Sequence, residues 1–427
     1  MTVPLAAALL LAITGGLSIA ERPLPAPLVR ATITLGAASG ADVVVVDGGL
    51  GHAAVGDSLD GAVRLFDDRD GRLLRTIAVG LAFASQALAV DARGHRLFVA
   101  GQAADRSGGH LWTLDARTGA LLHVARTGAA GASIGVVEGA DRAIIADEED
   151  DSAVVLDART GRVLRTVRVG RTPLSVAVDA RRARAYVVDG GAHIDGYPAS
   201  AGAVTVLNAR TGRALRTVAV GKEPTVTAVD GAAGLVVVAN RDDGAISLLD
   251  ARDGAPRGTM RVGQQPSCVV VDERRGRAFV VDALDDTVRV LDLRRRTTLR
   301  TVRVGAHPHA IAIDGTHGLV LVAADGPLDG GGRPLGPGQV DLLDAGSGAV
   351  VQVVAVGVAP RAIAVDGRQG RAIIVNSGGA VGAPAGWATW WASRVRRWLP
   401  WTPVSPASPT ASHAPASVSV LDLHAAR

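Results

Sequence analysis

The chain has 427 residues, of which 48% are hydrophobic and only 3% aromatic, so small aliphatic side chains must fill its core. Basic residues exceed acidic ones by only 45 to 41, and so small and scattered an excess argues against nucleic acid as a partner. A single cysteine, Cys268, excludes a disulfide framework.

An apolar run without charges, residues 3–20, stands near the N-terminus and ends in the small-x-small sequence Ser18-Ile19-Ala20. This pattern predicts a secretory signal peptide over residues 1–20, followed by a Pro-rich linker over residues 21–28. A retained membrane anchor is the alternative, because the run is close to the minimum length that spans a bilayer. We therefore expect an exported protein that is extracellular or associated with the cell envelope.

A β-hairpin pattern recurs along nearly the whole chain. In residues 153–170, AVVLDARTGRVLRTVRVG, two alternating apolar runs flank a polar turn, and the second run ends at a glycine. The full unit, seen in residues 222–263, holds four short strands. Terminal glycines mark eight such units, at Gly36, Gly80, Gly128, Gly170, Gly221, Gly263, Gly305 and Gly357. Four short strands repeated at this spacing predict the blades of a β-propeller.

The two ends of the chain carry complementary halves of one unit. Residues 29–36 match only a fourth strand, and residues 417–427 match only a third strand, so together they complete one blade and close the ring. We predict an all-β fold: a single β-propeller domain over residues 29–427 with eight four-stranded blades. Seven blades are the alternative if the unit that begins with residues 41–57 is irregular. A Trp-, Arg- and Pro-rich insertion at 377–415 interrupts the last blade.

The repeated unit reads P-x-x-V-A-V-D, then R-A-Y-V-V, then V-T-V-L-N-A-R-T-G-x-x-L-R-T-V-x-V-G. It resembles the YVTN-type β-propeller repeat family of exported bacterial and archaeal proteins, and the resemblance covers residues 29–376 and 416–427. The resemblance implies the fold. It implies no particular activity, because the family includes surface-layer proteins, binding propellers and lactonase-like relatives.

The connections between second and third strands hold nearly all the insertions and many of the acidic residues. In a propeller these connections share one face with the links between blades, so we predict one variable, acidic face and a regular, arginine-rich opposite face. Variable loops on a rigid ring are a usual place for binding. The candidate ligand- or cation-binding residues on this face are Asp147, Glu148, Glu149, Asp150, Asp151, Asp242, Asp243, Asp285, Asp286, His307 and His309.

These candidates also have structural interpretations. Acidic loop tips are typical of solvated turns, and the acids that end the first strands, from Asp47 through Glu138 to Asp366, are expected to cap turns. His307 and His309 point to one side of a strand, a geometry that can chelate a metal, but two ligands are too few without a partner such as His193. No metal and no cofactor are therefore assigned, with Ca²⁺ or another divalent cation as the alternative. Cys268 is expected to be a buried small residue.

Residues 386–403, GWATWWASRVRRWLPWTP, contain five of the six tryptophans. A helix here would gather most of them on one side and place polar residues on the other. The candidate lid or membrane contact comprises Trp387, Trp390, Trp391, Trp398, Trp401 and Arg394. A lid over the propeller, a membrane-surface contact through 386–401 and a protein-binding segment are the three alternatives.

No nucleophile with an adjacent base and no phosphate-binding loop stands out, so no catalytic residue is assigned. We expect an exported, non-enzymatic propeller that acts as a binding scaffold through its variable face, with a protein or a cell-envelope ligand as its partner. The alternative is a propeller enzyme, lactonase-like or an oxidoreductase, with a metal or cofactor at the mouth of the central channel.

Overall fold

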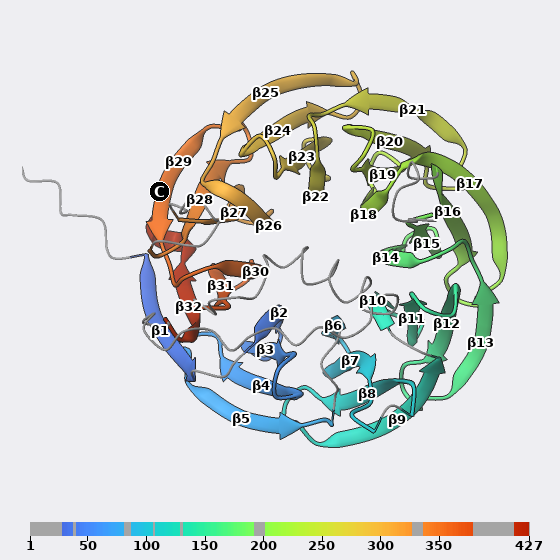
Figure 1. Ribbon diagram of the computed structural model, residues 1–427, viewed down its shortest axis with the longest axis horizontal. Helices are drawn as coiled ribbons and strands as arrows, with labels where there is room; N and C mark the ends of the chain where they lie inside the picture. The colour runs from blue at the N-terminus through green and yellow to red at the C-terminus, as the bar shows by residue number, and fades with distance from the viewer. Residues whose placement is uncertain are drawn as a thin grey trace, which may run out of the picture.

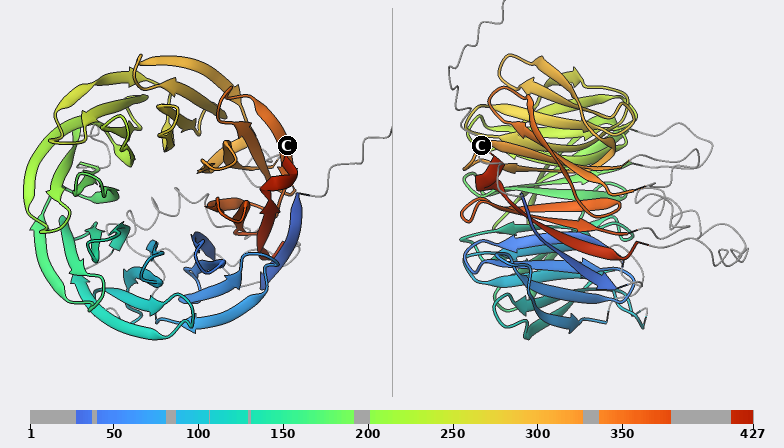
Figure 2. Two further views of the ribbon diagram at one scale, coloured as in Figure 1. Left: turned by 180° about the vertical axis from the view of Figure 1, so that it is seen from behind. Right: turned by 90° about the vertical axis from the view of Figure 1, so that its left-hand side faces the viewer.

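The computed structural model describes residues 28–36, 40–80, 87–105, 107–128, 131–191, 201–326, 336–378 and 414–426. These residues form eight four-stranded antiparallel sheets, which stand as blades around a ring (Figure 1). Seen edge-on, the strands run across the thickness of the ring (Figure 2). The predicted all-β propeller with eight blades is therefore confirmed, and the seven-bladed alternative is wrong.

The strands of the first four blades follow the sequence from the axis outward. Blade 1 comprises β2 (Ala41–Asp47), β3 (His52–Asp57), β4 (Ala62–Asp67) and β5 (Leu73–Ala78). Blade 2 comprises β6 (Ala87–Asp91), β7 (Arg96–Gln102), β8 (Gly109–Asp115) and β9 (Leu121–Gly128). Blade 3 comprises β10 (Gly131–Val137), β11 (Arg142–Asp147), β12 (Ser152–Asp157) and β13 (Val163–Arg168). Blade 4 comprises β14 (Pro173–Asp179), β15 (Arg184–Asp189), β16 (Ala201–Asn208) and β17 (Ala214–Lys222).

The remaining blades repeat this order until the chain returns to its start. Blade 5 comprises β18 (Pro224–Asp230), β19 (Leu235–Asn240), β20 (Ala245–Asp250) and β21 (Pro256–Arg261). Blade 6 comprises β22 (Pro266–Asp272), β23 (Arg277–Asp282), β24 (Thr287–Asp292) and β25 (Thr297–Arg303). Blade 7 comprises β26 (Ala306–Asp314), β27 (Leu319–Asp325), β28 (Gln339–Asp344) and β29 (Val350–Ala355). Blade 8 comprises β30 (Pro360–Asp366), β31 (Arg371–Asn376), β32 (Ala416–Asp422) and β1 (Val29–Gly36), with a 3₁₀ helix η1 (Leu423–Ala426) after β32.

The core lies between the blades. Adjacent blades pack face to face, so both faces of the second and third strands are buried, and these strands read as continuous apolar runs. Among the described residues, the buried apolar side chains fall into eight clusters, and each cluster joins two neighbouring blades. Full burial of a Val or Leu side chain contributes about 1.5–3 kcal/mol, so these layers hold the ring together.

The N-terminal strand closes the ring as predicted. β1 pairs antiparallel with β32, and Ile33 lies opposite Val418. At one end of this pair, Arg30 donates from Nε to Asp422 Oδ2 over 2.7 Å. The pairing gives β32 a partner on its outer side, so it does not remain an open edge that could pair with another chain.

Side chains at the start of second strands also tie one blade to the next. Their donors reach backbone carbonyls in the turn between the third and fourth strands of the following blade, for example from Arg184 Nε to the Arg252 carbonyl over 2.9 Å. Arg371 makes the equivalent bond across the closing seam, from Nη1 to the Arg69 carbonyl over 2.7 Å. The same pattern occurs at His52, Arg142 and Arg277. Several arginines of the predicted arginine-rich face therefore have a structural role.

The acids at the ends of first strands cap turns, with one exception. Seven of them accept backbone N–H groups from the turn that follows: Asp47, Asp91, Asp179, Asp230, Asp272, Asp314 and Asp366. The prediction was wrong for Glu138, because β10 ends at Val137 and the exposed Glu138 side chain pairs with Arg93 of blade 2 instead. The longer glutamate side chain is less suited than aspartate to a bond with its own turn.

The terminal glycine of blade 5, Gly263, has a steric cause. A Cβ atom on Gly263 would lie 1.5 Å from Oδ2 of Asp282, the buried acid that ends the second strand of blade 6. That carboxylate accepts the backbone N–H groups of Gln264 and Gln265, which begin the link to the inner strand. Glycine is needed because the backbone must approach the acid closely to be bonded by it.

Candidate functional site

The two faces of the ring differ in the lengths of their connections. We call the face that carries the second-to-third strand connections and the links between blades the loop face, and the opposite face the turn face. On the loop face the connections are short in four blades and long at 103–108, 190–200, 326–338 and 377–415. On the turn face the first-to-second strand connections are uniformly short, from 48–51 to 367–370. The strand bounds thus place the insertions on one face.

Several of the predicted acidic ligands hold this face together. Asp151 Oδ1 accepts the backbone N–H of Thr172 over 2.9 Å, and Asp286 Oδ1 accepts that of His307 over 2.8 Å. Thr172 and His307 have left-handed backbone conformations, with φ of 56° and 45°, so these bonds help to fix an otherwise unfavourable link. Asp243 Oδ2 accepts the backbone N–H of Lys222 over 2.8 Å.

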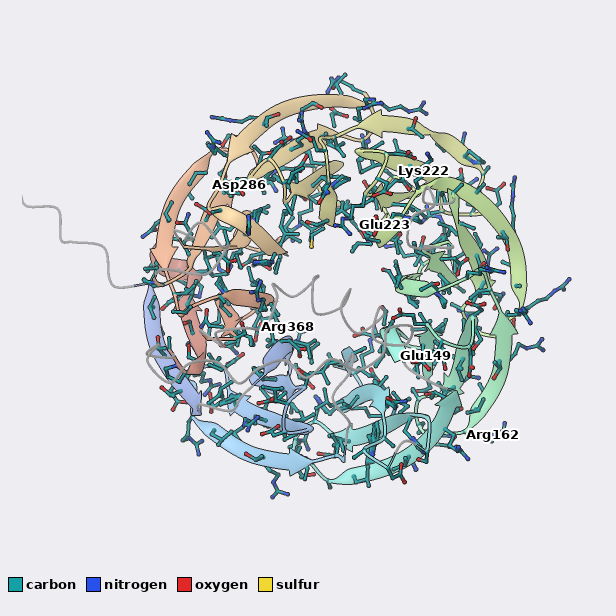
Figure 3. The ribbon with its side chains drawn as sticks, in the orientation of Figure 1. Glu149, Arg162, Lys222, Glu223, Asp286 and Arg368 are labelled. Carbon is teal, nitrogen blue, oxygen red and sulfur yellow. The ribbon has the colours of Figure 1, made fainter. Side chains whose placement is uncertain are left out.

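The other predicted acids occupy mixed environments. Asp147 is fully buried at the end of β11, and its Oδ1 accepts the backbone N–H of Asp150 over 3.2 Å. Asp285 Oδ1 accepts a hydrogen bond from the amide of Gln264 over 3.2 Å. The side chains of Glu149, Asp150 and Asp242 are exposed, whereas that of Glu148 is half-buried. Figure 3 shows Glu149 and Asp286 in different sectors of the ring, so these acids do not form one cluster.

Glu223 belongs to a polar cluster that the sequence analysis did not single out. It stands in the link to blade 5, beside Lys222 (Figure 3), and only 8% of it is exposed. Burial, together with a hydrogen bond to the Asp242 carboxyl group, raises the pKa of Glu223 to about 7, although the Arg241 guanidinium opposes the shift. Arg241 donates to Glu223 Oε1 over 3.0 Å. Arg241 thus forms an ion pair with Glu223, and the Asp242 carboxyl group bonds the same glutamate.

The two histidines of the His307-Pro308-His309 sequence face different surroundings. The His307 side chain is exposed, whereas only 12% of the His309 side chain is. His309 Nε2 lies 2.9 Å from Asp325 Oδ2 at the end of β27 and 2.5 Å from Arg361 Nη1 on β30 of the next blade. Burial is the main cause that lowers the pKa of His309, and the Arg361 charge acts in the same direction against the pull of Asp325.

Two polar groups, Asp325 and Arg361, thus converge on one ring nitrogen of His309. A neutral imidazole nitrogen can donate or accept, and not both, so Nε2 serves either Asp325 as a donor or Arg361 as an acceptor. The Asp325 side chain is only 3% exposed, and its Oδ1 atom has no hydrogen-bond partner among the described residues. Burial lowers the pKa of Arg361, because its charge is held away from water. Among the described residues, the buried Asp325 and Arg361 therefore have fewer hydrogen-bond partners than the charged groups of a stable buried ion-pair network.

Arg361 and Asp325 were missed as site residues in the sequence analysis. Arg361 is the second residue of β30, the inner strand of blade 8. The first and second strands pair in the same register in blades 1, 3, 4, 5 and 6, where the equivalent residues are Asp42, Ala132, Leu174, Thr225 and Ser267. None of these blades has a basic residue at this position. Comparison of the repeats could therefore have identified Arg361 from the sequence.

Cys268 also has a structural position. Its half-buried thiol donates to the His309 carbonyl of the next blade over 3.3 Å, and burial raises the pKa of the thiol to about 11. The equivalent residues of blades 3 and 4, Ser133 and Ser175, likewise bond the inner strand of the following blade. A thiol that stays protonated at neutral pH is a poor nucleophile, so this cysteine serves the contact between blades.

No group of three His, Cys, Asp or Glu side chains that could hold a metal ion occurs within the described ranges. The candidate lid or membrane residues Trp387, Trp390, Trp391, Trp398, Trp401 and Arg394 lie outside those ranges, as do His193 and residues 1–27. Within the part of the chain that the structure describes, no helix has the length and apolar character needed to cross a bilayer.

Comparisons with known proteins support the fold alone. No protein-family model matches the chain, and no curated protein matches it either. Among solved structures, the chain is similar to the computationally designed Ika8 protein, with a TM-score of 0.62 and 15% sequence identity over 80% of this chain and 95% of that one. At this level of identity the likeness concerns backbone architecture and carries no inference about activity.

Proposed function

We propose that this protein is a non-enzymatic binding module whose ligand docks on the loop face. One observation carries the proposal: the connections on this face vary from four residues, as at 241–244, to the whole of 377–415, while those on the turn face keep one short pattern. A constant framework with variable loops on one face is how rigid scaffolds present a binding surface.

The rigidity of the ring supports the same conclusion. The second and third strands are almost wholly buried, and arginine side chains join neighbouring blades through carbonyls of the turn face. The contacts on the turn face fix the strands that carry the loop face. Binding of a ligand there therefore carries no free-energy cost for ordering these strands.

The proposal extends to family and location. The repeated unit, with its T-G turn and terminal glycine, supports membership of the YVTN-type propeller repeats, and the apolar run at 3–20 supports export. A protein or another component of the cell envelope is then the partner, and a membrane-surface contact through 386–401 is part of the same proposal.

Loop replacement tests the binding function. Residues 190–200 and 326–338 are each replaced by the short connection of blade 6, residues 283–286, and a matched control exchanges the exposed turn-face residue Arg117 for alanine. A library of peptides and oligosaccharides is screened by thermal shift. Ligands that raise the Tm of the unmodified protein should fail with the loop variants and succeed with the control.

Two results would overturn the proposal. One is a ligand response that survives both loop replacements and disappears in the turn-face control. The other is stoichiometric metal in the purified protein that is lost when His307 and His309, or the acids of 147–151, are replaced, since this outcome would favour a metal-dependent propeller enzyme.

A further inference from the structure

We propose that Arg361 and His309 anchor a carboxylate or phosphate group of the ligand at the loop-face end of the inner strands, and that the anion binds together with a proton taken up by His309. This inference rests on the proposed binding function and specifies the chemistry of its central contact.

Arg361 is the donor in this site. Its one hydrogen bond among the described residues runs to His309 Nε2, and in the same part of the chain it forms no ion pair with a carboxylate. Other half-buried arginines are neutralised: Arg64 pairs with Asp57, and Arg241 pairs with Glu223. A guanidinium has five N–H donors in a planar fork that matches the two oxygens of a carboxylate or a phosphate. The described residues therefore use only a small part of the donor capacity of Arg361.

His309 links the anion to a proton. In the structure Arg361 Nη1 and Asp325 Oδ2 compete for Nε2. An anion that accepts hydrogen bonds from Arg361 releases Nε2, which can then bind a proton and donate a hydrogen bond to Asp325. The charged groups that face His309 are Asp325 from β27, Arg361 from β30 and His307 from its own strand, and neutralising Arg361 removes one of the two positive neighbours that oppose protonation. The anion and the proton therefore favour one another.

The position on the ring suits a ligand anchor. Arg361 and His309 lie on the inner strands of blades 8 and 7, and β26 and β27 pack directly against β30. The long connections 326–338 and 377–415 leave β27 and β31 of the same two blades, at the same face. An anionic group bound here would lie between the inner strands of blades 7 and 8, the two blades with the longest second-to-third strand connections.

Histidine NMR provides a local readout. The probe is inorganic phosphate, with acetate as a second arm and chloride to equalise ionic strength. The His309 ring signal is assigned by comparison with His309→Gln, and its titration curve is recorded with and without each anion. Phosphate or acetate should shift the His309 signal saturably and raise its pKa, and the anion should bind more tightly at about pH 6 than at about pH 8.

The variants separate a binding role from a general charge effect. Arg361→Gln should weaken phosphate binding about tenfold or more and abolish the coupling to His309, whereas Arg361→Lys should retain part of both. The exposed outer-strand variant Arg216→Gln removes the same charge and should leave the response unchanged. Thermal unfolding of each variant verifies that the ring is intact.

Each outcome decides the matter. A response to phosphate, to acetate or to both supports the site and names the anion class. No shift of the His309 signal with either anion, or an equal shift in Arg361→Gln, overturns it. The loop replacements test the binding function separately, because they leave Arg361 and His309 in place. If the loop replacements abolish binding of the library ligands while the His309 response to phosphate persists, both proposals stand. If library ligands bind but phosphate and acetate give no response, only this inference is overturned.

Discussion

Asp68 and Asp366 face each other across the seam where the last blade meets the first. Asp68 is fully buried and Asp366 is 3% exposed. Both oxygens of Asp68 and one oxygen of Asp366 have no partner among the described residues other than the opposite carboxyl group. In the other seven blades the position of Asp68 holds a buried apolar residue: Ala116, Ala158, Ala209, Ala251, Leu293, Ala345 and Leu423.

This pair predicts a pH-dependent seam. Burial first, and then the Asp366 carboxyl group, raise the pKa of Asp68 from 3.8 to about 7, with Arg371 opposing. The folded protein therefore holds a proton that the unfolded chain releases. The contribution of this pair to stability is therefore greatest below about pH 4, falls as pH rises to about 7 and is level above that, with a loss on the order of 2–4 kcal/mol.

Replacing Asp68 with alanine, the residue of five other blades, should remove this slope and stabilise the ring above pH 7. Urea unfolding of the wild type and Asp68→Ala between about pH 4 and about pH 8 measures the difference. Other buried acids with a raised pKa, such as Asp189 and Glu223, are common to both proteins and cancel. The exposed neighbour Asp70→Asn serves as the control, and parallel curves for wild type and Asp68→Ala would refute the prediction.

Ring closure depends on the N-terminal strand. Removing residues 28–36 together with everything before them exposes the outer edge of β32. It also removes the half-buried side chains of Ala31, Ile33 and Leu35, which pack against the core. We expect a loss of about 3 kcal/mol or more, with self-association through the open edge. Differential scanning calorimetry and size-exclusion chromatography would show both effects.

The matched control for that deletion removes only residues 1–27 and should match the full chain in Tm. A synthetic peptide of residues 28–36, added in trans, should restore part of the lost Tm. If the shorter protein unfolds at the same temperature as the control and stays monomeric, the ring does not need this strand.

The terminal glycines are not equivalent. Gly263→Ala would force a Cβ against the buried Asp282 carboxylate and should cost about 3 kcal/mol or more. At Gly80, where φ is 69° and no atom lies within 4 Å of the added Cβ, alanine should cost only about 1 kcal/mol for its backbone conformation. Chemical denaturation of the two variants compares them directly, and equal losses would contradict the steric explanation.

The tryptophan-rich segment supports a separate prediction from sequence. Anionic liposomes should shift the tryptophan emission to the blue and sediment the protein if residues 386–401 contact a membrane surface. The remaining tryptophan, Trp112, is buried in the ring and provides a constant background. Deleting 386–401 should abolish the response. Absence of a shift and of co-sedimentation in the full chain would exclude the membrane contact and leave a lid or a protein-binding segment.

The repeat itself was readable from the chain. Strand alternation, the T-G turns and the terminal glycines are local patterns, and every blade must satisfy the same packing on both sides, so each unit carries the same signals. Residues 29–36 and 417–427 indicated closure because each lacks its other half, and β1 does pair with β32. The acids from Asp47 to Asp366 were predicted as caps for the same local reason, and only Glu138 departs from it.

What the sequence could not determine is which polar groups meet across blades. Asp325 and Arg361, or Asp68 and Asp366, are far apart in the chain and follow no short-range pattern, and their pKa values depend on burial between neighbouring blades. The acidic residues of the loops were predicted as one set of ligand-binding candidates, but their burial and hydrogen bonds differ. Asp147 is buried, and Asp151 and Asp286 accept backbone N–H groups. Glu149 and Asp242 are exposed. The sequence by itself determined the ring, because the repeat is local. Only the tertiary structure decided where charge is left without a partner, because desolvation and pairing depend on the neighbours that folding brings together.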